Sequence, residues 1–135
     1  MKQKSITRER IDELLRFLPL FDVPGKSFIE RWAGGEQKEG VITMPYPVSP
    51  PEVQEFFRLA GSPWWCDDDY EPAVAAKMLA DDTLIAEASL DHIKTMLTYC
   101  VRGERFCDGH WDEMLRSGKV VQLLRGLEQL RETVT

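Results

Sequence analysis

Apolar residues recur at intervals of three and four along most of this chain. Between Ile11 and Leu18 they occupy positions i, i+3, i+4 and i+7, which places them on one face of a helix. Comparable stripes follow later in the chain: Val53, Phe56, Phe57 and Ala60; Leu90, Ile93, Leu97, Cys100 and Val101; and Val120, Leu123, Leu124, Leu127 and Leu130. Helices with one apolar face bury that face against each other. The sequence therefore predicts a mainly α fold with one shared core.

Short polar residues and helix-breaking residues mark where the predicted helices begin and end. The predicted N-caps, whose side chains accept a backbone N–H of the first turn, are Thr7, Ser27, Ser49, Asp69, Ser89 and Asp108. The predicted ends lie at Phe17 before Pro19, Gly34-Gly35, Gly61, Asp81–Thr83, Gly103 and Ser117-Gly118. A chain of 135 residues is long enough for one core but not two. We therefore expect residues 1–135 to form a single domain, an irregular bundle of roughly six or seven helices that includes a short one over residues 27–33.

The segment at residues 41–48, with the sequence VITMPYPV, has the pattern of an extended strand. Its side chains alternate between two faces, and Pro45 and Pro47 lie two residues apart. Backbone N–H groups two residues apart in a strand point to the same edge, so the two prolines remove donors from one edge. We therefore expect an edge strand or a lone extended segment here. No second segment of this quality is present, which argues against a sizeable sheet.

The charge and hydropathy of the chain argue against nucleic-acid and membrane partners. The net charge is -6 at pH 7, and residues 61–92 hold eight acidic side chains against Lys77 alone. An acidic chain without a basic stripe does not attract phosphate backbones, so nucleic acid is not an expected partner. No apolar run approaches the roughly 18 residues of a membrane helix. The charged start, MKQKSITRERIDELL, lacks the apolar stretch of a signal peptide, so we expect a cytoplasmic protein of bacterial type with reduced cysteines.

The densest group of polar side chains lies in LTYCVRGERFCDGHW, residues 97–111. Arg102, Glu104, Arg105 and His110 fall between the end of one predicted helix and the start of the next. The two guanidiniums and the free N–H groups of the 108–117 helix would bind a phosphate or a carboxylate, and Glu104 or His110 would move protons. The alternative is structural, because arginine near a helix end stabilises that end and bonds neighbouring carbonyls or carboxylates. The sequence leaves both interpretations open.

The cysteines, histidines and clustered aspartates do not have the spacing of a metal site. A zinc site needs about four ligands, and the chain has no C-x-x-C pair. Cys100 belongs to an apolar stripe, where a free cysteine behaves as a small hydrophobic residue. Cys107 and His110 are one helical turn apart, but nothing in the sequence supplies an oxyanion hole for a cysteine nucleophile. The triplet Asp67–Asp69 lacks the closing glutamate of a calcium loop, so we expect no metal and no cofactor.

Two adjacent tryptophans, Trp64 and Trp65, stand in the loop before the acidic triplet. Adjacent side chains in a loop do not easily both point inward, and an exposed tryptophan often marks a surface that contacts a partner. The alternative is that both rings pack over the edge of the core, since each brings a large apolar area. We name both residues as candidates for a partner surface.

Three segments of the chain together resemble one known family. They are LLRFLPLF near the start, TMPYPVS before the helix at residues 50–60, and LTYCVRGERFCDGHW followed by LRSGKVVQLLRGL. With these motifs the chain resembles an uncharacterised bacterial family, domain of unknown function 6508, over about residues 7–131. The resemblance implies a shared fold and draws attention to the turn from Arg102 to Gly109. It supplies no activity, ligand or catalytic residue.

The sequence favours one functional class and leaves a second one open. The sequence contains no glycine-rich phosphate loop and no G-x-S-x-G or H-E-x-x-H motif. The sequence therefore does not decide whether the protein is an enzyme. The tryptophan pair and the many apolar helix faces favour a module that binds a protein partner or forms a homodimer. The alternative is a binder of a small anion or nucleotide, or an enzyme acting on one, at the Arg102–His110 junction.

Overall fold

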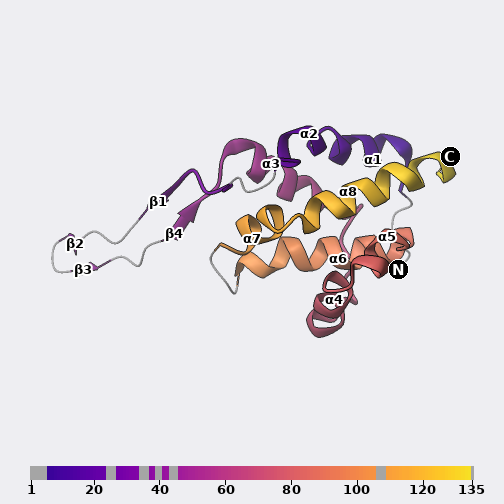
Figure 1. Ribbon diagram of the computed structural model, residues 1–135. Helices are drawn as coiled ribbons and strands as arrows, with labels where there is room; N and C mark the ends of the chain where they lie inside the picture. The colour runs from indigo at the N-terminus through magenta and orange to yellow at the C-terminus, as the bar shows by residue number, and fades with distance from the viewer. Residues whose placement is uncertain are drawn as a thin grey trace.

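The computed structural model describes residues 6–23, 27–33, 37–38, 41–42, 46–105 and 109–134. Within these ranges the chain forms eight α-helices, two 3₁₀ turns and four short strands (Figure 1). The helices are α1 (Arg8–Leu15), α2 (Leu18–Phe21), α3 (Pro51–Ala60), α4 (Pro72–Leu79), α5 (Asp82–Ala86), α6 (Leu90–Arg102), α7 (His110–Arg116) and α8 (Lys119–Leu130). The strands are β1 (Arg31–Ala33), β2 (Gln37–Lys38), β3 (Val41–Ile42) and β4 (Tyr46–Val48), and the 3₁₀ turns are η1 (Gly103–Arg105) and η2 (Arg131–Thr133). The prediction of a mainly α fold is confirmed.

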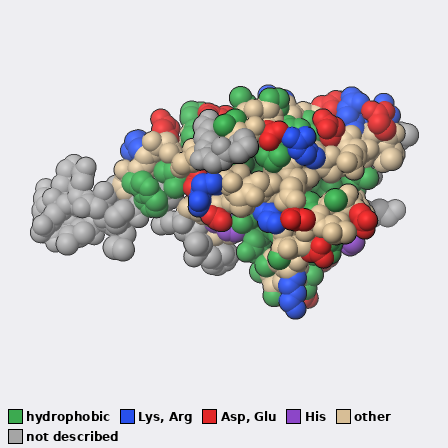
Figure 2. Space-filling model, viewed as in Figure 1, with side chains coloured by type: hydrophobic (Ala, Val, Ile, Leu, Met, Phe, Trp, Pro, Cys, Tyr) green, Lys and Arg blue, Asp and Glu red, His purple; other side chains and the backbone are tan. Residues whose placement is uncertain are grey.

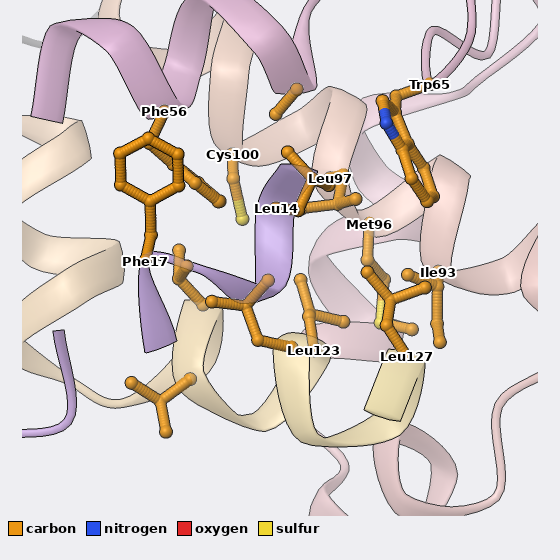
Figure 3. Packing of buried hydrophobic residues seen from close by; sticks show 14 of the residues in the cluster. Leu14, Phe17, Phe56, Trp65, Ile93, Met96, Leu97, Cys100, Leu123 and Leu127 are labelled. Carbon is orange, nitrogen blue, oxygen red and sulfur yellow. The ribbon is translucent and has the colours of Figure 1, made fainter. Parts of the chain in front are cut away.

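Helices α6 and α8 pack side by side, and the other helices surround them (Figure 1). Helix α6 also contacts α3, α4 and α7, while α8 contacts α1, α2, α5 and α7. The core side chains labelled in Figure 3 are Leu14, Phe17, Phe56, Trp65, Ile93, Met96, Leu97, Cys100, Leu123 and Leu127. The apolar stripes of the sequence therefore face one common core, as the helical spacing predicted.

Two of the predicted N-caps are confirmed. The Thr7 hydroxyl accepts the Arg10 N–H at 3.4 Å and starts α1, and the Ser89 hydroxyl accepts the His92 N–H at 3.2 Å and starts α6. Each hydroxyl satisfies a backbone donor that has no partner inside the helix. Helix α6 then continues to Arg102 and carries one buried face along its length.

Two predicted helix starts lie slightly too early in the chain. Helix α3 begins at Pro51 without a side-chain cap from Ser49, and α4 begins at Pro72 rather than directly after Asp69. Proline is well tolerated at the first helical position, because the N–H that it lacks would have no partner there. The Asp69 N–H instead donates to the Asp67 carboxylate at 3.0 Å, which makes the acidic triplet part of a turn.

The described ranges contain two short helices that the sequence did not predict, α2 and α5. Helix α2 follows α1 across Pro19, where the sequence predicted only a connector. At the predicted break after α4, the Asp81 carboxylate accepts the Leu84 N–H at 3.1 Å and caps α5. Aspartate therefore ends one helix here and begins the next.

The C-terminal turn η2 is bonded to α1. The Arg8 guanidinium donates to the carbonyls of Arg131 and Val134, the latter at 2.7 Å. The Arg131 guanidinium donates in turn to both carboxylate oxygens of Asp12, at 2.7 and 3.1 Å. A two-pronged arginine–carboxylate pair between distant segments fixes their relative position.

Residues 27–33 are extended, so the prediction of a helix capped by Ser27 is wrong. The reason is a distant carboxylate: Asp112 on α7 accepts the Phe28 N–H and the Ser27 hydroxyl. The Phe28 ring is buried against Phe21, with 5.6 Å between the ring centroids. These contacts hold the segment extended as it leads into β1.

The strands form a narrow antiparallel arm that leaves the helical body at one end (Figure 1). In the first pair, which we call the ribbon, Arg31 lies opposite Val48, Trp32 opposite Pro47 and Ala33 opposite Tyr46. Strands β2 and β3 form a second pair farther along the arm. The predicted extended segment is confirmed at residues 41–42 and 46–48, the described part of 41–48, whereas the partner strands β2 and β1 were not predicted.

Candidate functional site

The end of α6, the turn η1 and the start of α7 form a tight junction around His110. The His110 side chain is 9% exposed, and its ring meets the Tyr99 ring edge to face, with centroids 5.1 Å apart. A Cβ atom on Gly103 would lie only 2.3 Å from the His110 ring, so glycine is what allows the ring to lie directly on the backbone. The sequence predicted Gly103 only as a helix end. In the structure Gly103 also makes room for the His110 ring, which allows the junction to pack closely.

His110 is enclosed rather than open to a ligand. Among the described residues, its Nε2 atom is the one buried side-chain nitrogen or oxygen without a hydrogen-bond partner. Burial lowers the pKa of His110, and a backbone hydrogen bond with Tyr99 opposes this shift only in part. The imidazole is thus held in its neutral form inside the junction.

Glu104 caps the start of α7. Its two carboxylate oxygens accept the N–H groups of Gly109 and Trp111, at 2.9 and 2.8 Å. Gly109 has a positive φ of 88°, a conformation that glycine adopts without strain, and it stands where the sequence placed the cap near Asp108. A carboxylate at this point is stabilised by the unpaired N–H groups and the positive end of the helix. The protein's own carboxylate therefore occupies the position predicted for an external anion.

Arg102 turns away from His110 toward the loop at residues 61–71. One of its terminal nitrogens lies 3.0 Å from the Cys66 sulfur and 3.7 Å from the Asp68 carboxylate, and the guanidinium lies 5.1 Å from the Tyr70 ring centre. Burial and the Asp68 carboxylate raise the pKa of the Cys66 thiol, against the opposing effect of Arg102. Arg102 thus joins α6 to the acidic loop, and Cys66 keeps its proton at neutral pH.

The remaining residues of the predicted anion site are only partly described. The backbone of Arg105 belongs to η1, but its side chain, and all of Cys107 and Asp108, lie outside the described residues. The clamp of two guanidiniums and the Cys107–His110 pair are therefore still predictions. Across the residues that the structure does describe, no three His, Cys, Asp or Glu side chains lie close enough to share a metal ion.

The tryptophan pair does not form an exposed surface. Trp65 is 1% exposed and packs in the core, which corrects its assignment to a partner surface (Figure 3). Trp64 is half-buried, and the Arg10 guanidinium lies 4.3 Å from its ring centre. The loop that follows is anchored to α6, because the Asp67 N–H donates to Thr98 and its carboxylate accepts the Thr95 hydroxyl. Both rings therefore pack on the body of the protein.

A different tryptophan is exposed, and the sequence interpretation missed it. Trp32 on β1 is 58% exposed, the largest value among the exposed large hydrophobic residues of the described ranges. Figure 2 shows hydrophobic side chains over the base of the arm, where the ribbon leaves the helices. The available signal was Pro47, the middle residue of β4: a strand with one edge that lacks a donor requires a partner on its other edge.

A groove of about 720 Å³ lies at the base of the ribbon. It is lined by Val48, Ser49, Pro51, Gln54, Glu55, Phe57, Arg58, Glu104 and Trp111. Its aromatic part is rigid, because the Phe57 and Trp111 rings stack with centroids 4.5 Å apart and an angle of 5° between their planes. The indole N–H of Trp111 donates to the Val101 carbonyl at 3.0 Å and fixes the ring to α6. The groove thus combines an apolar floor with charged rims.

Comparison with known proteins places the chain in a family without assigning it a function. The model of a family described as "Family of unknown function (DUF6508)" matches residues 6–133. No curated protein and no solved structure matches the chain. None of the helices in the described ranges combines the length and apolar character needed to cross a membrane.

Proposed function

The chain belongs to this family of unknown function, and we propose that it is a protein-interaction module whose contact surface is the ribbon and the groove at its base. The observation that carries this proposal is the exposure of Trp32, at 58% of its surface. Tryptophan is enriched among the few residues that supply most of the binding energy in protein interfaces. A large aromatic ring on a projecting strand is costly in water and favourable in a contact.

The size of the ribbon also supports a role in contact formation. Its ladder contains three residue pairs, and each strand has one neighbour among the described residues. A two-stranded ribbon is only marginally stable in water, since it buries little apolar surface. A partner that covers the ribbon would stabilise it, so binding and ordering of this element would be coupled.

The groove supplies a second part of the same contact surface. Val48 of β4 lines it together with Phe57 and Trp111, so the ribbon and the groove are continuous. The apolar floor is already ordered by ring stacking and by the bond from Trp111 to Val101. A pre-organised aromatic floor with charged Glu55 and Arg58 at its rim matches the usual arrangement of an interface, with an apolar centre and a polar border.

The alternative proposal, a small-anion or nucleotide site at the Arg102–His110 junction, has less support. The first N–H groups of α7 bond Glu104, whose negative charge would repel a second anion. Arg102 bonds the Cys66–Asp68 segment, and His110 is enclosed against Gly103. A thermal-shift screen with inorganic phosphate, nucleotides and divalent metals tests this proposal directly. Ligand at a hundred times its dissociation constant would add about 2.7 kcal/mol of stability.

Photocross-linking at two positions tests the proposed contact surface. The photoreactive residue p-benzoylphenylalanine replaces Trp32 in one variant and Val74 in a matched control, because Val74 is 48% exposed on α4, away from the arm. After illumination of expressing cells, we expect a defined protein adduct at position 32 and none at position 74. Adding Ala33→Pro, which disrupts the ribbon, should abolish the adduct at position 32. Equal adducts at both positions, or none at position 32, would refute the proposal.

A further inference from the structure

The register of the ribbon and the missing N–H of Pro47 together indicate which backbone groups of β1 point away from β4. Residue pairs in an antiparallel ladder alternate between those that bond each other and those whose N–H and C=O groups point outward. Pro47 has no N–H, so the Trp32–Pro47 pair is of the outward type. The backbone N–H and C=O of Trp32 therefore face the outer edge of β1. That edge offers one donor and one acceptor at the residue with the most exposed ring.

The outer edge of β4 is closed by its own sequence. Pro47, the middle residue of β4, supplies no donor there. An incoming strand that paired with β4 would leave its own carbonyl group opposite Pro47 without a donor. Strand β1 carries no proline, so it is the edge of this ribbon on which another strand can pair. The two edges of the ribbon are thus unequal.

We infer that the partner is a second copy of this chain, an inference that rests on the proposed function. The two copies pair antiparallel through their β1 strands, about a two-fold axis at Trp32. The two ribbons then form a four-stranded sheet in the order β4, β1, and β1 and β4 of the second copy. The Trp32 N–H of each copy donates to the Trp32 C=O of the other, so one residue satisfies both open groups. A self-complementary contact of this kind is what a two-fold axis requires.

Side chains along β1 agree with this register. With the axis at Trp32, the two indoles lie next to each other on one face of the sheet, and aromatic cross-strand pairs are favourable. Arg31 lies opposite Ala33 of the partner subunit, so the two arginines do not face each other. A three-residue strand buries less than the roughly 800 Å² per partner of a standard interface. We therefore expect a dimer that dissociates in the micromolar range.

Disulfide trapping tests the register of the two strands. Two residues that bond each other across antiparallel strands have Cα atoms about 5.5 Å apart, which suits a disulfide. We expect Trp32→Cys, in a background with Cys66→Ser and Cys107→Ser, to oxidise to a covalent dimer. Cys100 stays in this background because burial raises its pKa to about 12 and removes its reactivity. The matched control Val74→Cys should stay monomeric, and equal cross-linking by both variants would overturn the inference.

Two substitutions at one position separate backbone pairing from side-chain contact. Trp32→Val removes the indole and keeps the outward N–H, whereas Trp32→Pro removes both and leaves the β1–β4 ladder intact, because that N–H is not used there. By analytical ultracentrifugation, we expect a dimer for the wild type, dissociation weakened on the order of tenfold for Trp32→Val, and a monomer for Trp32→Pro. Circular dichroism shows that each variant is folded. Equal dimerisation of the two variants would overturn edge pairing.

The combined results distinguish failure of this inference from failure of the proposed function. A monomeric wild-type chain whose position-32 photo-adduct contains a different protein would overturn the second copy and keep the interaction module. An adduct with the mass of two chains, together with a trapped Trp32→Cys dimer, supports both. No adduct at position 32 and no dimer at any micromolar concentration would remove both.

Discussion

Gly103→Ala measures how tightly the α6–α7 junction is packed. Gly103 has φ −60° and ψ −28°, which alanine adopts freely. Alanine lowers the conformational entropy of the unfolded chain, and this effect alone would stabilise the protein by about 0.4–1 kcal/mol. The added Cβ would lie 2.3 Å from the His110 ring, far inside the contact distance of roughly 3.5–4 Å. Overpacking of a buried site costs about 1–3 kcal/mol. The steric cost is the larger effect, and we expect a net loss of about 1–2 kcal/mol.

Urea unfolding of four proteins measures this balance: the wild type, Gly103→Ala, His110→Ala and the double variant. With a slope of about 2 kcal/mol/M, the expected loss lowers the unfolding midpoint by roughly 0.5–1 M at unchanged slope. In the His110→Ala background the ring is absent, so Gly103→Ala should become neutral or stabilising. The two substitutions should therefore couple by at least about 1 kcal/mol. The same penalty in both backgrounds, or a more stable Gly103→Ala, would refute the packing argument.

Three further substitutions have expected outcomes. Glu104→Gln should lower the free energy of unfolding by about 1–2 kcal/mol, because it removes a charged acceptor from two N–H groups at the start of α7. The exposed control Glu128→Gln should change the free energy of unfolding by less than about 0.5 kcal/mol. Burial lowers the pKa of His110 below 6.5, so His110 binds a proton at a higher pH in the unfolded chain than in the folded one. The free energy of unfolding should therefore fall as the pH drops below about 6.5. Urea titrations of His110→Gln should not show this loss. Trp65→Ala should cost about 3–5 kcal/mol, because the ring is 1% exposed in the core, whereas Trp64→Ala should cost markedly less; similar losses in thermal or urea unfolding would contradict the assigned packing.

Local patterns in the sequence predicted the helices well because the features that define them are close together in the chain. The stripe from Val53 to Ala60 and the Ser89 cap involve residues three or four positions apart, and both are present in the structure. A helix needs only this spacing and a donor or acceptor at each end. The remaining errors in helix starts, as at Pro51, are one or two residues.

Contacts between distant residues explain what local patterns did not predict. Residues 27–33 have helical spacing, yet a carboxylate 84 positions away, on Asp112, holds the Phe28 N–H. The role of Glu104 as the cap of α7 depends on bonds with Gly109 and Trp111, five and seven positions away, and no regular sequence pattern marks those pairs. Trp64 and Trp65 look alike in the sequence, and only the packing of the loop on α6 decides which of them is buried.

The arm begins and ends at a single point of the helical body, because the Glu30 N–H donates to the Val48 carbonyl at 2.8 Å. Because the two ends of the arm are in contact, the arm can be shortened, lengthened or replaced without shifting any helix of the body. The entropy of closing a loop changes only slowly with the length of the loop. A tight turn between these two positions should leave a bundle with the same interior. A foreign hairpin grafted between the same two positions would project from an unchanged helical bundle. In this architecture the sequence of the arm, and with it the partner that the arm binds, can therefore vary independently of the bundle.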